Sequence, residues 1–171
     1  MDRYNRFGLI LRKFNIEPLR LGNKKDKAAL QESIIKMKTI TYSDTHDFKA
    51  SDLEDLFLSV EWSSGHFPDK LVVAMRNFRT VYSAWDGDKL VGMVCAMDDG
   101  IMTAYLHYML VRPEYHQQGI GHKLLAMMKE HYESYLRIAL IAYNAELGFY
   151  ESCGFKRAED ASPMFITSLW T

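Results

Sequence analysis

A glycine-containing turn between a strand pattern and a helix pattern is the feature that most constrains how this chain can fold. Strand-forming residues over 102–111 stop at Arg112-Pro113, and Gly119-Ile120-Gly121 then opens a segment with apolar residues at helical spacing up to Tyr132. Residues 137–143 are typical of a strand buried on both faces, parallel to the first through a right-handed crossover. The sequence therefore predicts a strand, loop, helix and strand, with glycines where the helix starts.

The other segments alternate in the same way and predict a mixed α/β domain. Asp86-Gly87-Asp88 is a strong hairpin signal, so the strands on its two sides should pair antiparallel. Pro68 suits the first position of a helix, and the helix before it should begin at Ser43 or Ser51. In chain order, the further predicted strands are 39–42, 80–85, 89–97 and 165–170, and the further predicted helices are 52–58, 68–78 and 146–152.

Size and charge favour one ordinary globular domain. With 171 residues, 48% of them hydrophobic, the chain can bury one good core, so we expect a domain over 37–171 preceded by a basic extension over 1–36. The net charge of -1 favours no nucleic-acid partner, and no apolar run approaches the roughly 20 residues of a membrane helix. Cys95 and Cys153 lack metal-like spacing and favour a reducing compartment, so we expect a cytoplasmic protein without a metal.

The chemistry should concentrate at Gly119-Ile120-Gly121. The first amides of a helix have no partners within it, and the helix dipole adds partial positive charge, so a pyrophosphate could bind there. A tight turn that needs glycine only for close packing explains the same residues equally well. Leu124 stands where a Rossmann loop requires its third glycine, and no Gly-Lys-Ser/Thr follows for a P-loop.

Two motifs at matching separation resemble those of the GNAT N-acetyltransferases. They are Val111-Arg112-Pro113 ahead of Gln117-Gln118-Gly119-Ile120-Gly121, and Phe149-Tyr150 ahead of Gly154-Phe155. The resemblance implies the GNAT-like fold, in which helices cover both faces of a central mixed, mostly antiparallel sheet with a splayed parallel strand pair. It also implies transfer of an acetyl group from acetyl-CoA to a primary amine by direct attack, without a covalent enzyme intermediate.

Within that family, the strand and loop look closest to the arylalkylamine N-acetyltransferases, where a His-x-His strand leads to a Gln-Gln-Gly-x-Gly loop. His107 matches the second of those histidines, and Tyr105 stands in place of the first. His116 occupies a position where the family usually has Arg or Gln, and Asn144 only loosely matches an asparagine often found before the last helix.

The resemblance also implies where the cofactor binds. Backbone groups of Met109, Leu110 and Val111 would contact the pantetheine, and Phe149 would pack on the cofactor. The residues that would hold the pyrophosphate are His116, Gln117, Gln118, Gly119, Ile120, Gly121 and His122.

Three residues are candidates for proton transfer. His107 is the expected base, because an imidazole titrates near pH 6.5, although a histidine packed in the sheet fits the pattern as well. Glu61 is a second candidate base, or else a solvated carboxylate. The resemblance favours Tyr150 as the acid that protonates the departing thiolate, with a core tyrosine as the alternative.

Strand alternation would place His107 on one face with Tyr105 and Met109. Tyr108 would point to the opposite face unless a bulge near the end of the strand changes the alternation.

Aromatic residues dominate the predicted acceptor site. Trp62, Phe67 and Tyr105 are the expected substrate-binding residues and favour a small amine. A polyamine, an aminoglycoside, a protein or peptide amine, and a non-catalytic acyl-CoA-binding module are the alternatives. The apolar run 165–170 predicts a homodimer formed through terminal strands.

Overall fold

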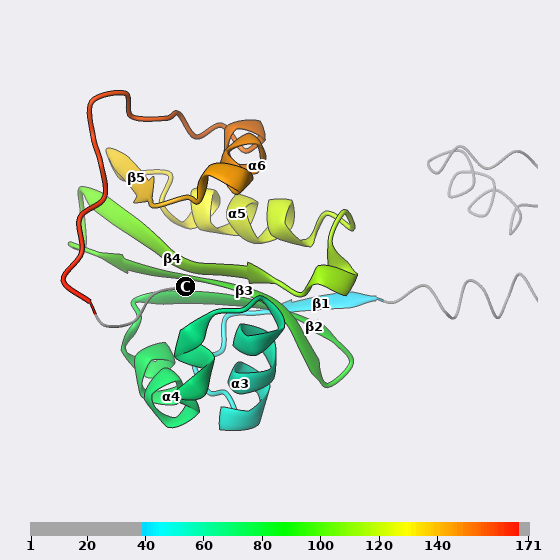
Figure 1. Ribbon diagram of the computed structural model, residues 1–171. Helices are drawn as coiled ribbons and strands as arrows, with labels where there is room; N and C mark the ends of the chain where they lie inside the picture. The colour runs from blue at the N-terminus through cyan, green and yellow to red at the C-terminus, as the bar shows by residue number, and fades with distance from the viewer. Residues whose placement is uncertain (1–38, 168–171) are drawn as a thin grey trace, which may run out of the picture. The chain divides into compact units, whose positions relative to one another are not determined.

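The predicted hairpin lies at the centre of the sheet in the computed structural model, which describes residues 39–167 (Figure 1). Strands β2 (Thr80–Asp86) and β3 (Lys89–Asp98) pair antiparallel from Thr80 opposite Ala96 to Asp86 opposite Lys89. Gly87 makes the turn with a φ of 60°, a backbone angle that glycine adopts without steric cost. The hairpin prediction is confirmed.

Three further strands complete a mixed sheet of order β1-β2-β3-β4-β5. Strands β1 (Ile40–Ser43) and β4 (Thr103–Val111) extend the sheet antiparallel, and β5 (Arg137–Leu140) pairs parallel with β4. The parallel pairing ends at Leu106 opposite Leu140, whereas β4 continues to Val111. The predicted mixed, mostly antiparallel sheet is therefore correct, and the second half of β4 has no strand beside it on the β5 side within residues 39–167.

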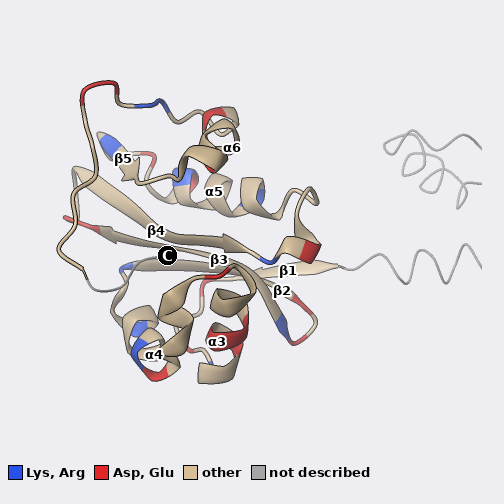
Figure 2. Ribbon diagram, viewed as in Figure 1, with Lys and Arg blue, Asp and Glu red and all other residues tan. Residues whose placement is uncertain are grey.

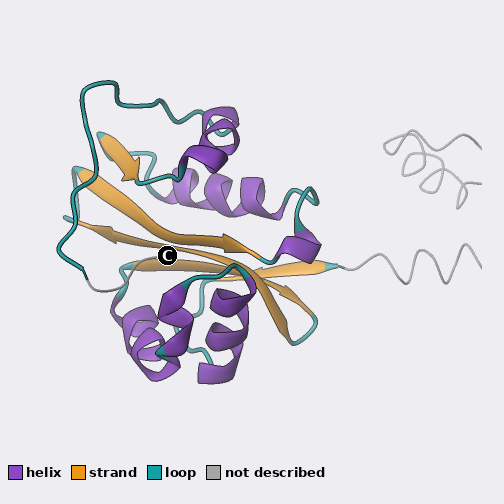
Figure 3. Cartoon of the chain, viewed as in Figure 1, coloured by secondary structure: helices purple, strands orange, loops and turns teal. Residues whose placement is uncertain are grey.

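Helices cover both faces of the sheet and create two hydrophobic cores (Figures 1 and 3). Helices α3 (Ala50–Ser59) and α4 (Pro68–Asn77) cover one face, and α5 (Ile120–His131) and α6 (Leu147–Ser152) cover the other. Short 3-10 turns connect them: η1 (Ser63–His66), η2 (Pro113–Tyr115) and η3 (Asn144–Glu146). We call the side that carries α3 and α4 the α3/α4 face, and the other side the α5/α6 face.

The helix starts show where local signals succeed. Pro68 occupies the first turn of α4 as predicted. Helix α3 instead begins after Lys49, without a side-chain capping bond, so the predicted starts at Ser43 and Ser51 are both wrong. Burial of Leu53, Leu56 and Phe57 on one stripe stabilises α3 in place of a cap.

Two predictions near the carboxyl end are also wrong. β5 ends at Leu140, and its residues are exposed or half-buried because it lies at the edge of the described sheet. Phe165–Thr167 form no strand, and the rest of the predicted 165–170 strand lies outside the described residues. Met164 and Ile166 are fully or nearly fully exposed. The predicted homodimer and the basic extension over 1–36 stay predictions, and that extension also lies outside the described residues.

A partly buried hydrogen-bond network fixes the end of α5 to the sheet. The Tyr132 hydroxyl donates to Asp98 Oδ2 at 2.8 Å and lies 2.8 Å from Thr80 Oγ1, while the Tyr135 hydroxyl donates to Asp98 Oδ1 at 3.2 Å. Burial raises the pKa of Tyr132 to about 12. Tyr132 is only 1% exposed and Thr80 only 5%, so little water could replace the phenol at Thr80 Oγ1.

Replacing Tyr132 with phenylalanine should lower the free energy of unfolding by about 2 kcal/mol, because it removes two hydrogen bonds, one of them to the buried Thr80. Urea denaturation measures this loss. Tyr135→Phe is the matched control and should cost about 0.5 kcal/mol, since Tyr135 is partly exposed and its bond is longer. Equal losses in the two variants would show that burial of Tyr132 adds nothing to its hydrogen bonds.

Among residues 39–167, no helix is long and apolar enough to cross a membrane.

Candidate active site

The loop between β4 and α5 is fixed to the central hairpin. The Arg112 side chain is buried, and its Nε donates to the Leu90 carbonyl at 2.8 Å. The Tyr115 hydroxyl donates to Asp86 Oδ2 at 2.6 Å. These two contacts hold η2 against β2 and β3, so the chain leaves β4 in a defined direction before it enters α5.

The start of α5 presents a row of unpaired amides. Gly119 precedes the helix with a φ of 79° and Gln117 has a φ of 60°. No backbone N–H from Gln117 to His122 donates to an oxygen within residues 39–167. No atom lies within 4 Å of the position where a Gly119 side chain would begin. The geometry therefore fits a phosphate-bearing group held by backbone amides at a helix N-terminus.

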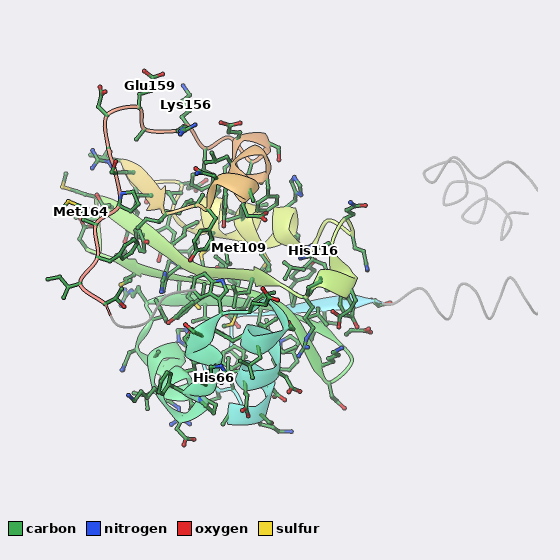
Figure 4. All side chains as sticks on the ribbon, viewed as in Figure 1. His66, Met109, His116, Lys156, Glu159 and Met164 are labelled. Carbon is green, nitrogen blue, oxygen red and sulfur yellow. The ribbon has the colours of Figure 1, made fainter. Side chains whose placement is uncertain are left out.

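Two polar side chains of this loop are turned away from that opening. His116 Nε2 donates to the Val111 carbonyl at 2.8 Å, and Gln118 Nε2 donates to the Glu114 carbonyl at 3.2 Å. Figure 4 shows His116 in the loop beyond the end of β4. In this arrangement the two residues would bind an anion through their backbone groups, while their side chains stabilise the loop.

Gly121 has a different reason to be glycine. A side chain there would begin 2.9 Å from Phe149 Cζ and 3.2 Å from Met109 Cε. The Phe149 ring also lies edge-on to the His122 ring, with 5.1 Å between centroids. Close packing of α6 on α5 therefore explains Gly121, while the left-handed backbone explains Gly119.

A bulge in β4 reverses the side-chain alternation near its end. Two residues of β4, Tyr108 and Met109, oppose Val94 alone on β3. Tyr108 has a φ of 50°, in the left-handed region that non-glycine residues rarely adopt. Met109 consequently packs on the α5/α6 face beside Gly121, where Figure 4 shows it between β4 and α5. The prediction that His107 and Met109 share a face is wrong, because the extra residue shifts the period by one.

Aromatic rings surround His107 on the α3/α4 face. The ring centroid of Tyr108 lies 3.9 Å from that of the imidazole, and Trp62, Tyr105 and Phe78 lie at 6.0, 6.0 and 6.2 Å. Burial lowers the pKa of His107 from its usual value, so the imidazole is neutral at pH 7. Its ring has no hydrogen-bond partner within residues 39–167. A neutral, half-buried imidazole with free nitrogens can accept a proton.

Tyr105 and Tyr150 extend this cluster to the point where β4 and β5 part. A hydrogen bond from the Ile141 backbone reaches the Tyr105 phenol, whose pKa burial raises. Burial, and then the charges of Glu146, Cys153 and Tyr105, raise the pKa of Tyr150 to about 12. Because the charge of Tyr105 contributes to the raised pKa of Tyr150, the two phenols lie within electrostatic range of each other, although one comes from β4 and the other from α6.

Two other predicted site residues lie further out. Glu61 is exposed, with a φ of 60° immediately before Trp62. Phe67 is 43% exposed and its ring lies under Lys70 Nζ at 5.0 Å. The structure thus brings Trp62 to His107 but places neither Glu61 nor Phe67 in contact with the imidazole. Phe78, which was not predicted as a site residue, immediately follows α4, and its ring centroid lies 6.2 Å from that of His107.

The walls of this cluster are almost free of charge. Figure 2 shows that the strands carry few Lys, Arg, Asp or Glu residues away from their ends. No group of three or more His, Cys, Asp or Glu side chains among the described residues is arranged to hold a metal ion. A separate cavity of about 480 Å³ lies between the ends of α5 and α6 and the start of β5 and includes none of the predicted site residues.

Comparisons with known proteins agree with this geometry. Residues 77–157 match the family model for the acetyltransferase (GNAT) domain. A GNAT family acetyltransferase from Streptococcus pneumoniae TIGR4 has a similar structure, with a TM-score of 0.64 and 26% identity over 76% of this chain and 98% of that chain. A search of curated proteins finds no match.

More distant structures share the fold alone. Glucosamine-6-phosphate N-acetyltransferase from Arabidopsis thaliana has a TM-score of 0.58 and 12% identity over 75% of this chain and 99% of that chain. An aminoglycoside acetyltransferase from an uncultured soil metagenomic sample, solved in complex with sisomicin, has a TM-score of 0.54 and 18% identity over 75% and 95%.

The sheet, the two helix layers and the open start of α5 therefore define a GNAT acetyltransferase fold. Residues 77–157 carry the GNAT domain, and the protein is an acetyltransferase.

Proposed function

We propose that the protein transfers an acetyl group from acetyl-CoA to a small primary amine by direct attack in a ternary complex. The observation that carries this proposal is the combination of unpaired amides from Gln117 to His122 with His107 and Tyr150 near the gap between β4 and β5. The amides suit the pyrophosphate of the donor, and the two side chains suit the proton transfers of acetyl transfer to an amine.

The donor would lie along the second half of β4. Beyond Leu106, the edge of β4 on the β5 side has no strand partner within the described residues. Met109, Leu110 and Val111 can therefore offer backbone groups to the amides of pantetheine, as an exposed strand edge does to a peptide. Phe149 of α6, which packs against Gly121 near the start of α5, is suitably placed to pack on the cofactor.

His107 would act as the base. Amines with a pKa near 10 arrive protonated, and a neutral imidazole can remove that proton directly or through water. Because burial lowers the pKa of His107, the neutral form persists at and somewhat below pH 6.5. Glu61 is exposed and would act only through solvent, so we assign the base to His107.

Tyr150 would act as the acid. Its pKa of about 12 keeps the phenol protonated throughout the physiological pH range, so it can donate a proton to the sulfur that leaves. Its neighbour Phe149 fixes α6 against α5, which holds the phenol at a set distance from the cofactor loop.

The aromatic surroundings of His107 support an acceptor with an apolar or aromatic body. Trp62, Phe78, Tyr105 and Tyr108 offer ring faces and edges but no charge. Such walls favour an arylalkylamine, in agreement with the resemblance of the strand and loop to arylalkylamine N-acetyltransferases. A polyamine or an aminoglycoside would need carboxylates that this cluster does not offer.

Calorimetric titration with acetyl-CoA tests the donor site. Gly119→Glu should weaken binding by about 30-fold, because a left-handed residue gains a side chain and a negative charge faces the phosphates. Gly87→Glu is the matched control, since Gly87 also has a positive φ and open space but lies in the hairpin turn. It should bind as the native protein does.

The acceptor is tested by thiol release with phenethylamine, spermidine and a lysine peptide. Release with phenethylamine alone supports the proposal. Binding of acetyl-CoA without release by any amine would favour a non-catalytic acyl-CoA-binding module, and absence of binding by the folded native protein would overturn the donor site.

A further inference from the structure

The unusual backbone of Tyr108 is left unexplained by the proposed chemistry. A bulged position with positive φ is normally filled by glycine, because other residues incur a cost of about 1–3 kcal/mol there. This chain instead places a bulky aromatic residue at a φ of 50°, in the second half of β4. Contacts of the Tyr108 ring must offset this strain, and those contacts indicate the role of the residue.

The bulge brings two consecutive side chains to the same face. In a regular strand, neighbours point to opposite faces, yet His107 and Tyr108 both lie among the aromatic residues of the α3/α4 face. Their ring centroids are 3.9 Å apart with planes tilted by 39°, which is the shortest ring contact that either residue makes. Tyr108 therefore forms the wall against which the imidazole packs.

The position of the Tyr108 ring is itself well fixed. Phe57 of α3, which is fully buried, contacts it edge-on at 4.9 Å, and Trp62 and Phe78 contact it at 5.3 and 5.8 Å. The buried Ser64 side chain lies near its phenol and opposes the increase in the Tyr108 pKa that burial causes. Residues of helix α3 and of the segment at turn η1 thus fix one side of the Tyr108 ring, and its other side packs on the His107 imidazole.

His107 lacks the usual means of orientation. A histidine that acts as a base is commonly oriented by a hydrogen bond from its second nitrogen to a carboxylate or carbonyl. Within residues 39–167, the His107 imidazole has no such partner, and the titratable side chains in ring contact with it are the two phenols of Tyr105 and Tyr108. Ring packing must therefore do what a hydrogen bond does elsewhere.

We propose that Tyr108 is a positioning residue, whose ring is turned by the bulge onto the α3/α4 face and fixes the orientation of the His107 imidazole toward the acceptor amine. The inference rests on the proposed function, because it matters for the reaction only if His107 is the base. It explains why the strained position is occupied by a large ring: the packing of that ring both offsets the strain and orients the imidazole.

The test compares Tyr108→Leu with the conservative Tyr108→Phe. Tyr108→Leu keeps an apolar side chain but loses the flat ring, so kcat should fall at least tenfold while the Kd for acetyl-CoA is unchanged. The His107 pKa, followed by NMR titration of the imidazole, should rise toward 6.5 as water enters. Tyr108→Phe retains the ring and should restore both values to within about twofold and a few tenths of a pH unit.

A second variant covers the case in which Tyr108→Leu does not fold. Tyr108→Gly relieves the positive φ and also removes the ring, so it should show the same loss of kcat and the same increase in the His107 pKa. Because the chain has six histidines, His107→Gln identifies the His107 signal. Native kcat and native His107 pKa in a folded Leu or Gly variant would overturn the inference. If His107→Gln itself retained native kcat, the proposed base would fail instead, which separates the two outcomes.

Discussion

His107→Gln is expected to lower kcat by about two to three orders of magnitude, because a general base typically contributes a factor of this size. Glutamine is similar in size and polarity to histidine, so the ring cluster around Trp62, Tyr105 and Tyr108 loses a ring but gains no cavity of consequence. Steady-state thiol release at saturating acetyl-CoA and amine measures the change. The Kd for acetyl-CoA should stay the same, since the residue lies on the α3/α4 face, away from the start of α5.

The pH dependence gives this prediction a second readout. In the native enzyme, kcat should fall as the pH drops through the pKa of His107, and the midpoint should lie below 6.5 because burial lowers that pKa. The variant should lose this acid limb. His46→Gln is the matched control: His46 is partly buried and bonds to the Met75 carbonyl near α4, so its replacement should leave both kcat and the acid limb in place. An unchanged acid limb in His107→Gln would assign the base to another group.

Phe57→Ala should lower the free energy of unfolding by about 4 kcal/mol, which corresponds to a nearly 1,000-fold smaller folding constant. Phe57 is fully buried at the centre of the core under the α3/α4 face, and truncation leaves a cavity that the neighbouring rings cannot fill. Urea denaturation measures the change. Val73→Ala on α4 is the control, because Val73 is 55% exposed and should cost less than about 1 kcal/mol.

The same substitution should reach the active site. The Phe57 ring contacts Tyr108 and Trp62, at 4.9 and 6.5 Å between centroids, so its loss removes the support behind the ring wall at His107. Folded Phe57→Ala at low temperature should therefore show a lower kcat than Val73→Ala. A stability loss similar to that of the control would mean that α3 relaxes into the vacated space.

Signals that act over a few residues predicted most of the fold correctly. Asp86-Gly87-Asp88 makes the hairpin, Pro68 begins α4, and Gly119 immediately precedes α5, because turn residues and helix starts depend on the local backbone. The burial of β5 was predicted wrongly, because a short apolar run does not indicate whether its strand will lie inside the sheet or at its edge. The 165–167 part of the predicted last strand was also wrong, because an apolar run does not by itself provide a strand to pair with.

The part of the site formed by backbone amides of the motif was predictable from the sequence. The contacts between aromatic rings from distant parts of the chain were not. The sequence indicated the open amides after Gln117, which follow from the position of Gly119 at a helix start. It could not place Tyr108, because tyrosine carries none of the conformational freedom that marks a bulge, and it could not bring Phe78 to His107 across a separation of nearly thirty residues. Only the packed structure shows these contacts.

Gly121 links two parts of the reaction that the sequence keeps far apart. Phe149 Cζ lies 2.9 Å from the position where a side chain of residue 121 would begin, and Tyr150 is the next residue on the same helix as Phe149. The lack of a side chain at Gly121 therefore sets the distance between the loop proposed to bind acetyl-CoA and Tyr150, the proposed acid. If a larger residue at 121 pushed α6 away from α5, the Tyr150 phenol would lie too far from the sulfur to donate its proton. The cofactor loop and Tyr150 would both still be intact.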